Sequence, residues 1–249
     1  MKLKSKIAIV TGGSSGIGQA GAISLAREGA DILITYRSNE KGAIDTKNKI
    51  IDLGRKCEII KADLENIDDI RIIVKSTIEK YSGIDILVNN AGDCKGMDFL
   101  DDNIENLDYL LNANLKSIFI LSQLVAKEMI KRGGGSIINI TSVSGIVVDD
   151  TKLVSYCTSK AAANMLTKGM AKALGKYNIR VNAILPGTIN TPLLRRETSK
   201  DEAEIIKEKT PLKILGQPED ISEIIVFLSS YDSKFITGSL IVADGGFTI

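Results

Sequence analysis

The chain has 249 residues, 44% of them hydrophobic and 25% charged, which is typical of a folded globular protein and excludes a disordered or fibrous one. Its formal net charge is +1, so the composition offers no general attraction for nucleic acid or for an anionic membrane. Histidine is absent, which excludes Ser-His-Asp or Cys-His catalysis and zinc sites built on imidazole.

Runs rich in isoleucine and valine alternate with longer amphipathic segments along the chain. The runs are apolar throughout, which is typical of parallel strands covered by helices on both faces. Seven strands are predicted, at 7–10, 31–35, 57–61, 84–89, 136–141, 180–185 and 240–243. The segments between them predict helices, among them 16–28, 41–53, 67–80, 106–132, 154–176 and 218–229.

This alternation predicts an α/β fold, a single domain over residues 1–249 with a Rossmann-type, doubly wound parallel seven-stranded sheet and helices on both faces. Such sheets bind ligands beyond the carboxyl ends of their strands. A charged segment at about 188–212, between the Pro186-Gly187 turn and Pro211, is predicted to be helical. It is either a solvated surface helix or a lid over a substrate.

A glycine-rich loop follows the first predicted strand directly and opens the first helix. Glycine lets the backbone approach a diphosphate closely, and the free N–H groups of a helix N-terminus favour an anion. The position predicts a dinucleotide-binding loop, although a glycine turn can also be purely structural. No GxxxxGK[ST] motif is present, which disfavours ATP or GTP. The candidate cofactor contacts are Gly12, Ser14, Ser15, Gly16, Ile17 and Gly18.

The end of the second predicted strand bears on the choice of cofactor. NAD-binding folds usually place an acidic residue about 20 residues after the glycine loop, where it binds the ribose 2′-hydroxyl. Here Tyr36 and Arg37 occupy that place. A guanidinium suits a 2′-phosphate, so the sequence modestly favours NADP(H), with NAD(H) still possible. Arg37 can equally be an ordinary solvated arginine.

Tyr156 and Lys160 stand four residues apart in a predicted helix and therefore project from the same face. A phenol has a pKa near 10, and bringing that pKa to neutrality takes roughly 4 kcal/mol, much of which a neighbouring ammonium can supply. Ser142 follows the predicted strand 136–141, where its hydroxyl can hold a carbonyl at the ligand-binding edge. A lone Tyr-x-x-x-Lys pattern is usually only helix surface, so the context decides.

The context resembles the short-chain dehydrogenase/reductase superfamily over essentially the whole chain. The motifs that carry the resemblance, in order, are Thr-Gly-x-x-x-Gly-Ile-Gly at 11–18, Asp63, Asn89-Asn90-Ala91-Gly92, Asn114, Ser142, Tyr156-x-x-x-Lys160 and Pro186-Gly187. The resemblance implies an NAD(P)(H)-dependent oxidoreductase that moves a hydride between nicotinamide C4 and a secondary alcohol or ketone. It implies that Tyr156 is the general acid/base, that Lys160 lowers the Tyr156 pKa, that Ser142 polarises the carbonyl and that Asn114 supports a proton-relay water.

The same resemblance assigns the cofactor contacts. Asp63 and Leu64 would meet the adenine, Asn90 and Gly92 would border the cofactor cleft, and Lys160 would hold the nicotinamide ribose. Taken together, the contacts expected beyond the glycine loop are Arg37, Asp63, Leu64, Asn90, Ala91, Gly92, Tyr156, Lys160, Pro186, Gly187, Ile189 and Thr191. Family members usually form homotetramers through the segments 106–132 and 154–176 and the C-terminal strand.

The resemblance leaves two substrate classes open. One difference from the family pattern weakens any assignment of a substrate by analogy. The chain resembles glucose 1-dehydrogenases around 35–38 and 186–192, and 3-oxoacyl-[acyl-carrier-protein] reductases in its general layout, so a sugar and an acyl thioester are both expected. The segment between Ser142 and Tyr156 is a residue longer than in common members, with an acidic loop at 147–152. A silent dinucleotide-binding sensor and a methyltransferase remain as alternatives of another class.

Cys57, Cys94 and Cys157 are scattered without a CxxC pair, so we expect reduced thiols, no disulfide framework and no metal site. The N-terminus carries no apolar segment long enough for a signal peptide, and no run approaches a membrane span. A cytoplasmic location is therefore expected.

Overall fold

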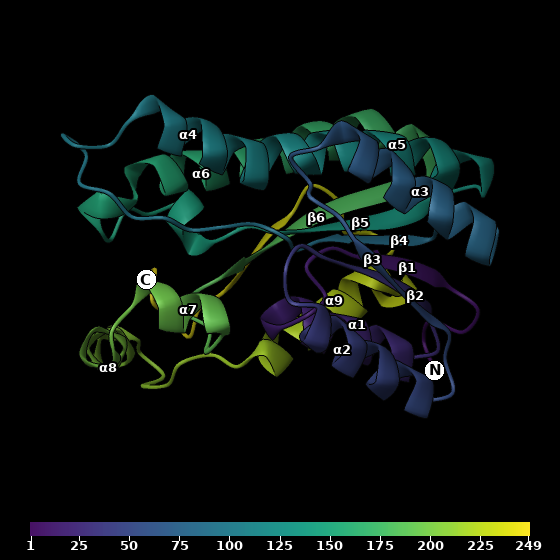
Figure 1. The fold of residues 1–249 in the computed structure, drawn as a ribbon, viewed down its shortest axis with the longest axis horizontal. Coiled ribbons are helices and arrows are strands. Elements are labelled where there is room, and N and C mark those ends of the chain that lie inside the picture. Colours follow the sequence, from purple (N-terminus) through teal and green to yellow (C-terminus); the bar gives the residue numbers. More distant parts are fainter.

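Seven parallel strands form one sheet between two layers of helices (Figure 1). The computed structural model describes residues 1–249, except for the side chain of Lys200. The strands are β1 (Ile7–Val10), β2 (Asp31–Tyr36), β3 (Cys57–Lys61), β4 (Ile86–Asn89), β5 (Gly135–Ile140), β6 (Ile179–Pro186) and β7 (Leu240–Ala243). Their order is β3-β2-β1-β4-β5-β6-β7, and every neighbouring pair is parallel. The predicted doubly wound seven-stranded sheet is confirmed.

Helices cover both faces of the sheet (Figure 1). On one face lie α1 (Gly16–Arg27), α2 (Glu40–Asp52) and α9 (Pro218–Ser229). On the other lie α3 (Ile67–Tyr81), α4 (Ile104–Leu111), α5 (Ser117–Lys131) and α6 (Val154–Leu174). Short 3-10 turns occupy Val143–Gly145, Thr151–Leu153, Gly175–Tyr177 and Tyr231–Ser233.

The strands are apolar throughout because each one feeds two cores. Successive strand side chains point to opposite faces of a sheet. Val10 and Ile34 belong to one buried cluster with Leu25 of α1, whereas Ile9 and Leu33 belong to the other, which includes residues of α3 and α5. Burial on both sides therefore explains the runs of isoleucine and valine.

The order of the strands reverses beside β1. The chain runs from β1 outward to β2 and β3, and then returns to β4 on the opposite side of β1. The carboxyl ends of β1 and β4 therefore diverge into separate crossovers, which leaves a crevice between them. The glycine loop leaves β1 here, and Asn90-Ala91-Gly92 leaves β4.

The predicted helix 106–132 is wrong as a single helix. It comprises α4, a π-helical turn at Asn112–Lys116 and α5, and it begins earlier, at Ile104. A π-helical turn places one extra residue between hydrogen-bonded partners, so it rotates the following residues relative to an α-helix. The apolar pattern alone does not show this change, because both halves keep their buried stripes.

Two helices occupy the predicted segment 188–212. They are α7 (Pro192–Glu197) and α8 (Lys200–Lys209), and they lie beyond the carboxyl ends of the strands (Figure 1). The Thr191 hydroxyl caps α7, and Ser199 and Glu202 form a reciprocal capping box at the start of α8. The helical expectation is confirmed, and the lid function remains a prediction.

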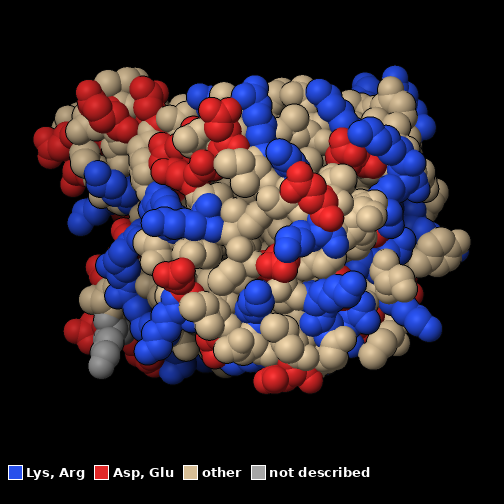
Figure 2. Space-filling view, turned by 45° about the vertical axis from the view of Figure 1, so that its right-hand side comes forward, with Lys and Arg blue, Asp and Glu red and all other residues tan. Residues whose placement is uncertain are grey.

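The surface and the helices bear on the expected partners. On the face shown in Figure 2, both Lys and Arg side chains and Asp and Glu side chains are exposed. Among the described residues, no helix combines the length and apolar character that crossing a membrane demands.

Candidate active site

A cleft of about 1030 Å³ opens beyond the carboxyl ends of the strands. Its walls come from the glycine loop, the segments after β2 to β6, the start of α6, and α7 and α8. Of the residues predicted from the sequence, those lining it are Gly12, Ser14, Ser15, Gly16, Ile17, Arg37, Asp63, Leu64, Asn90, Ala91, Gly92, Ser142, Tyr156, Lys160, Pro186, Gly187, Ile189 and Thr191. Gly18 and Asn114 lie behind this lining.

The glycine loop is held in a shape that needs glycine. Gly12 has a φ of +65° and Gly16 a φ of +55°, both in the left-handed region. A Cβ on Gly18 would collide with the carbonyl of Gly12 and the side-chain amide of Asn90. Gly18 therefore acts through packing, because it allows α1 to approach the loop that precedes it.

Asn90 and Thr11 tie the ends of β1 and β4 together. The Nδ2 of Asn90 donates to the Thr11 carbonyl at 2.9 Å, and the Thr11 hydroxyl accepts from the backbone N–H groups of Asn90 and Ala91 at 2.9 Å each. These bonds fix the two walls of the crevice at the switch point.

The N-terminus of α1 can receive an anion. Asparagine side chains cap α2, α3 and α4, whereas in the part of the chain that the structure describes no side chain caps α1. Its first N–H groups open on the cleft together with the helix dipole, which suits a diphosphate. The residues present therefore fit a dinucleotide.

Tyr156 and Lys160 lie one turn apart on α6, with Ser142 facing them from the end of β5. The Lys160 Nζ lies 5.6 Å from the centre of the Tyr156 ring and donates to the Ile140 carbonyl at 3.4 Å. The Lys160 side chain is buried, and burial lowers its pKa to about 8. The sequence-predicted grouping of these three residues on one wall is therefore present in the structure.

The pKa of Tyr156 is shifted in the direction opposite to the expected one. Burial raises it above the usual value of a phenol, and the Cys94 thiol adds to this, while the neighbouring Ser142 hydroxyl opposes it. Tyr156 is thus a neutral phenol at neutral pH. The lowering that the Lys160 ammonium was expected to impose does not outweigh burial.

Asn114 lies in the π-helical turn, and its side chain forms hydrogen bonds with the backbone of the segment that follows β4. Its Oδ1 accepts from the Asp93 N–H at 2.9 Å, and its Nδ2 donates to the Asp93 carbonyl at 2.9 Å and to the Ser159 hydroxyl at 3.0 Å. A Cβ on Gly92 would lie 2.6 Å from that Oδ1 and 3.5 Å from the Lys160 Nζ. Asn114 and the Lys160 ammonium therefore both lie beside Gly92.

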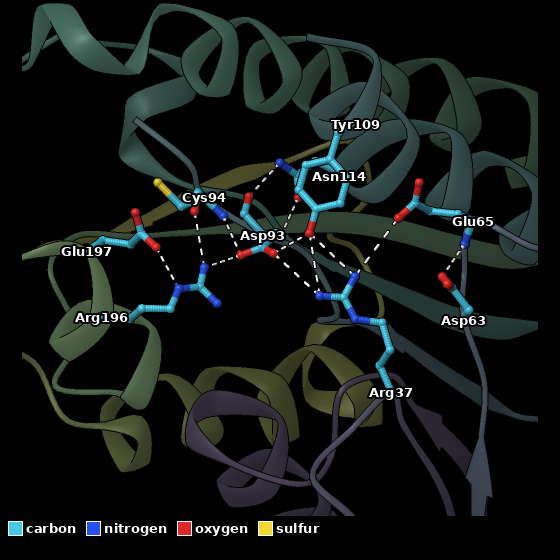
Figure 3. A network of polar contacts seen from close by, with 9 residues as sticks. All are labelled: Arg37, Asp63, Glu65, Asp93, Cys94, Tyr109, Asn114, Arg196 and Glu197. Atoms are coloured by element: carbon cyan, nitrogen blue, oxygen red, sulfur yellow. Dashed lines mark hydrogen bonds and ion pairs between the residues drawn. The ribbon is translucent and has the colours of Figure 1, made fainter. Parts of the chain in front are cut away.

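A network of charged side chains at this cleft was not predicted from the sequence (Figure 3). Asp93 accepts hydrogen bonds from Tyr109 of α4 and from Arg196 of α7, and it forms an ion pair with Arg37. Glu65, after β3, faces Arg37 with its carboxylate 4.0 Å away. These residues come from five separate stretches of the chain, so no spacing in the sequence signals them.

Metal-binding side chains are not gathered here. Within the described residues, no three Cys, Asp or Glu side chains come together as a metal site would need, and the chain has no His.

The comparisons with known proteins cover nearly the whole chain. Residues 12–248 match the family model described as enoyl-(acyl carrier protein) reductase. A 3-oxoacyl-[acyl-carrier-protein] reductase FabG of Thermotoga maritima is 37% identical, with 100% of each chain covered. An L-rhamnose 1-dehydrogenase (NAD(P)(+)) of a Sphingomonas species is 35% identical over 98% of this chain and 96% of its own. A solved 7α-hydroxysteroid dehydrogenase complexed with NADH and 7-oxo glycochenodeoxycholic acid has a TM-score of 0.95 at 36% identity, covering 98% of this chain and 95% of that chain.

The parallel sheet, the glycine loop and the cleft at the switch point define a nucleotide-dependent oxidoreductase of the α/β class. Of these relatives, the rhamnose dehydrogenase is named for NAD(P)(+), and the hydroxysteroid dehydrogenase was solved with NADH and a 7-oxo ligand. The chain belongs to the short-chain dehydrogenase/reductase superfamily.

Proposed function

We propose that this protein interconverts a secondary alcohol and a ketone with NAD(P)(H), using Tyr156 as the general acid/base. The observation that carries the proposal is the convergence of Tyr156, Lys160 and Ser142 on the same cleft as the uncapped N-terminus of α1. The dinucleotide would bind at the α1 N-terminus, and the proton transfer would take place in the same cleft at Tyr156. When bound, the nicotinamide supplies or accepts the hydride.

The cleft-lining residues divide the cofactor between them. The α1 N-terminus and the loop from Gly12 to Ile17 would hold the diphosphate, and Asp63 and Leu64 would meet the adenine. Asn90 to Gly92 would border the middle of the cofactor. The segment from Pro186 through Thr191 would meet the carboxamide, and Thr191 lies against the glycine loop, since a Cβ on Gly16 would be 3.1 Å from its Cγ2.

Arg37 is the proposed contact for a 2′-phosphate. Its guanidinium lines the adenosine end of the cleft and is half exposed, so it can reach a ligand there. This supports binding of NADP(H), with NAD(H) also accepted because a neutral 2′-hydroxyl does not require the guanidinium.

The proton moves at the Tyr156 hydroxyl. Because burial keeps this phenol neutral at neutral pH, Tyr156 is set up to donate a proton to a carbonyl oxygen, and Ser142 would hold that oxygen by a hydrogen bond. Lys160 would hold the nicotinamide ribose and support the phenolate that donation leaves. Asn114 acts as a positioning residue, because it fixes the backbone of Asp93 next to Gly92 and Lys160.

Helices α7 and α8 are proposed as a lid over the substrate. They contribute Leu194, Glu197, Ile205 and Ile206 to the cleft wall, so the substrate would meet both apolar and charged groups. Arg196 joins this lid to Asp93 on the opposite wall. Such segments close over substrates and exclude water in many enzymes.

The proposed substrate is a 3-oxoacyl thioester or a sugar, the classes named by the two relatives above. The reductase-like substrate suits the apolar residues of the lid, and the sugar suits the carboxylates of Asp149, Asp150 and Glu202 at the cleft.

A homotetramer is proposed because apolar side chains remain uncovered on the outer helices. Phe119 of α5 and Met165 of α6 are 50% and 67% exposed, and patches of this kind often pack against a second copy. Light scattering at micromolar concentration measures the mass directly, and a monomeric mass would contradict the assembly.

The function is tested by binding and turnover together. NADPH and NADH are titrated into the protein while their fluorescence is followed, and a panel of 3-oxoacyl thioesters, sugars and polyols is then assayed with both cofactors. Enhanced emission and turnover of one substrate class are expected. Binding without turnover of any alcohol or ketone would favour a silent sensor, and no binding would overturn the proposal.

A further inference from the structure

Asp93 stands between two arginines that come from opposite walls of the cleft (Figure 3). Arg37 follows β2 at the adenosine end, and its Nη2 lies 3.6 Å from the Asp93 Oδ2. Arg196 belongs to α7 and donates a hydrogen bond to the Asp93 Oδ1. The Asp93 carboxylate therefore pairs with two guanidinium groups, and of these only Arg37 is the proposed contact for a 2′-phosphate.

The Asp93 carboxylate is a fixed charge rather than a mobile side chain. Asn114 binds both its backbone N–H and its carbonyl at 2.9 Å, and the N–H of Cys94 donates to its Oδ1 at 2.9 Å. Its side chain is only 13% exposed. Burial alone would raise its pKa, but hydrogen bonds from Tyr109 and Arg196 outweigh burial and hold the pKa below the usual range.

The Arg37 guanidinium already interacts with other side chains of the protein. Both of its Nη atoms point to the Tyr109 hydroxyl, at 3.4 and 3.5 Å, and that hydroxyl in turn donates to Asp93. Glu65 faces it from the other side. A bidentate contact with a phosphate would use the two Nη groups of Arg37, and Tyr109, Asp93 and Glu65 already interact with these groups.

We propose that Asp93 determines cofactor specificity by competing with the 2′-phosphate for Arg37. A 2′-phosphate that reaches Arg37 must draw the guanidinium away from Asp93 and Tyr109, and it brings about two negative charges toward a carboxylate that cannot swing aside. A 2′-hydroxyl meets neither obstacle. Asp93 thus weakens NADP(H) binding selectively and leaves NAD(H) binding nearly unchanged. This inference rests on the proposed contact between Arg37 and the 2′-phosphate.

The central test is Asp93→Asn, which removes the charge but keeps the Oδ1 that accepts from the Cys94 N–H, while an Nδ2 that can donate to the Tyr109 hydroxyl replaces the Oδ2 that accepts from it. Dissociation constants for NADPH and NADH are measured by nicotinamide fluorescence, without any substrate. We expect the NADPH constant to fall about fivefold, the scale of a half-exposed ion pair, and the NADH constant to change less than twofold. An unchanged ratio of the two constants would overturn the proposal.

Two companion variants keep the result interpretable. Glu197→Gln removes the charge of the second carboxylate that pairs with Arg196, whose Nε lies 2.6 Å from Glu197, without touching Arg37. It is the matched control, and the ratio of the two dissociation constants should not move. Tyr109→Phe removes the hydroxyl that links Arg37 to Asp93, and it should raise the NADPH preference in the same direction as Asp93→Asn. It also provides the test if thermal melting shows that Asp93→Asn does not fold.

Variants of Arg37 separate this inference from the function on which it rests. If Arg37→Ala leaves the ratio of NADPH to NADH affinity unchanged, the 2′-phosphate contact itself is wrong. If Arg37→Ala lowers that ratio but Asp93→Asn does not raise it, only the role of Asp93 fails. In the double variant the effect of Asp93→Asn should shrink, and its persistence in full would overturn competition for Arg37.

Discussion

The Lys160 ammonium lies 5.6 Å from the centre of the Tyr156 ring, one turn further along α6, and in the cleft wall Lys160 is buried while Tyr156 is partly buried. Their environment favours the uncharged form of each group. The pKa of Lys160 falls to about 8 and that of Tyr156 rises, in both cases because of burial. This pairing gives a proton donor for ketone reduction, and it costs folding stability.

Replacing Tyr156 with Phe should lower kcat for the reduction by about 10²- to 10⁴-fold, the usual contribution of a positioned general acid. The ring and its packing remain, so the dissociation constant for NAD(P)H should stay within about twofold. Steady-state kinetics and nicotinamide fluorescence provide the two readings. Turnover at the wild-type rate would show that another group carries the proton.

The two directions of the reaction should respond differently to pH. Ketone reduction needs the neutral phenol, which the raised pKa of Tyr156 preserves at neutral pH, so its kcat should be near maximal at pH 7. Alcohol oxidation needs the phenolate, so its kcat should rise as pH increases toward the alkaline range. Initial rates in both directions between pH 6 and pH 10 check this. A rate of oxidation that does not change with pH would be incompatible with Tyr156 as the base.

Lys160→Met should stabilise the protein while abolishing its activity. Below pH 8 the folded state keeps a buried ammonium whose pKa has dropped from 10.5 to about 8, which costs roughly 3 kcal/mol relative to the unfolded chain. Between about pH 8 and 10.5 only the unfolded state remains protonated, so this cost declines as pH rises. Urea unfolding at pH 7 should therefore show a more stable variant, by about 1 to 3 kcal/mol, and at pH 10 the difference should be smaller. A variant that is less stable at pH 7 would show that the ammonium is fully compensated.

The features that could be predicted from the sequence are those encoded by short, local stretches of the chain. The continuous apolar strands and the glycine loop after β1 specify the sheet, its class and the edge where ligands bind, because each signal lies within a few adjacent residues. The π-helical turn around Asn114 left no such signal, since it changes the backbone register without interrupting the apolar pattern. The pairing of Asp93 with Arg37 and Arg196 arises only when distant segments meet. The direction of the Tyr156 pKa likewise depends on burial, which spacing does not report.

Gly92 should be more important than its exposure suggests, because it leaves room for two functional groups at once. In Gly92→Ala the new Cβ would lie 2.6 Å from the Asn114 Oδ1 and 3.5 Å from the Lys160 Nζ, so Asn114 must shift and release the backbone of Asp93. Since misplacement by about 1 Å can cost 10²-fold in rate, we expect kcat to fall by at least tenfold.

Gly169→Ala is the matched control, because nothing lies within 4 Å of its Cβ position on the exposed side of α6. That variant should gain about 0.5 to 1 kcal/mol of stability from helix propensity and keep its activity. Wild-type kcat in Gly92→Ala would show that Asn114 and Lys160 tolerate displacement, which would contradict the positioning role of Asn114.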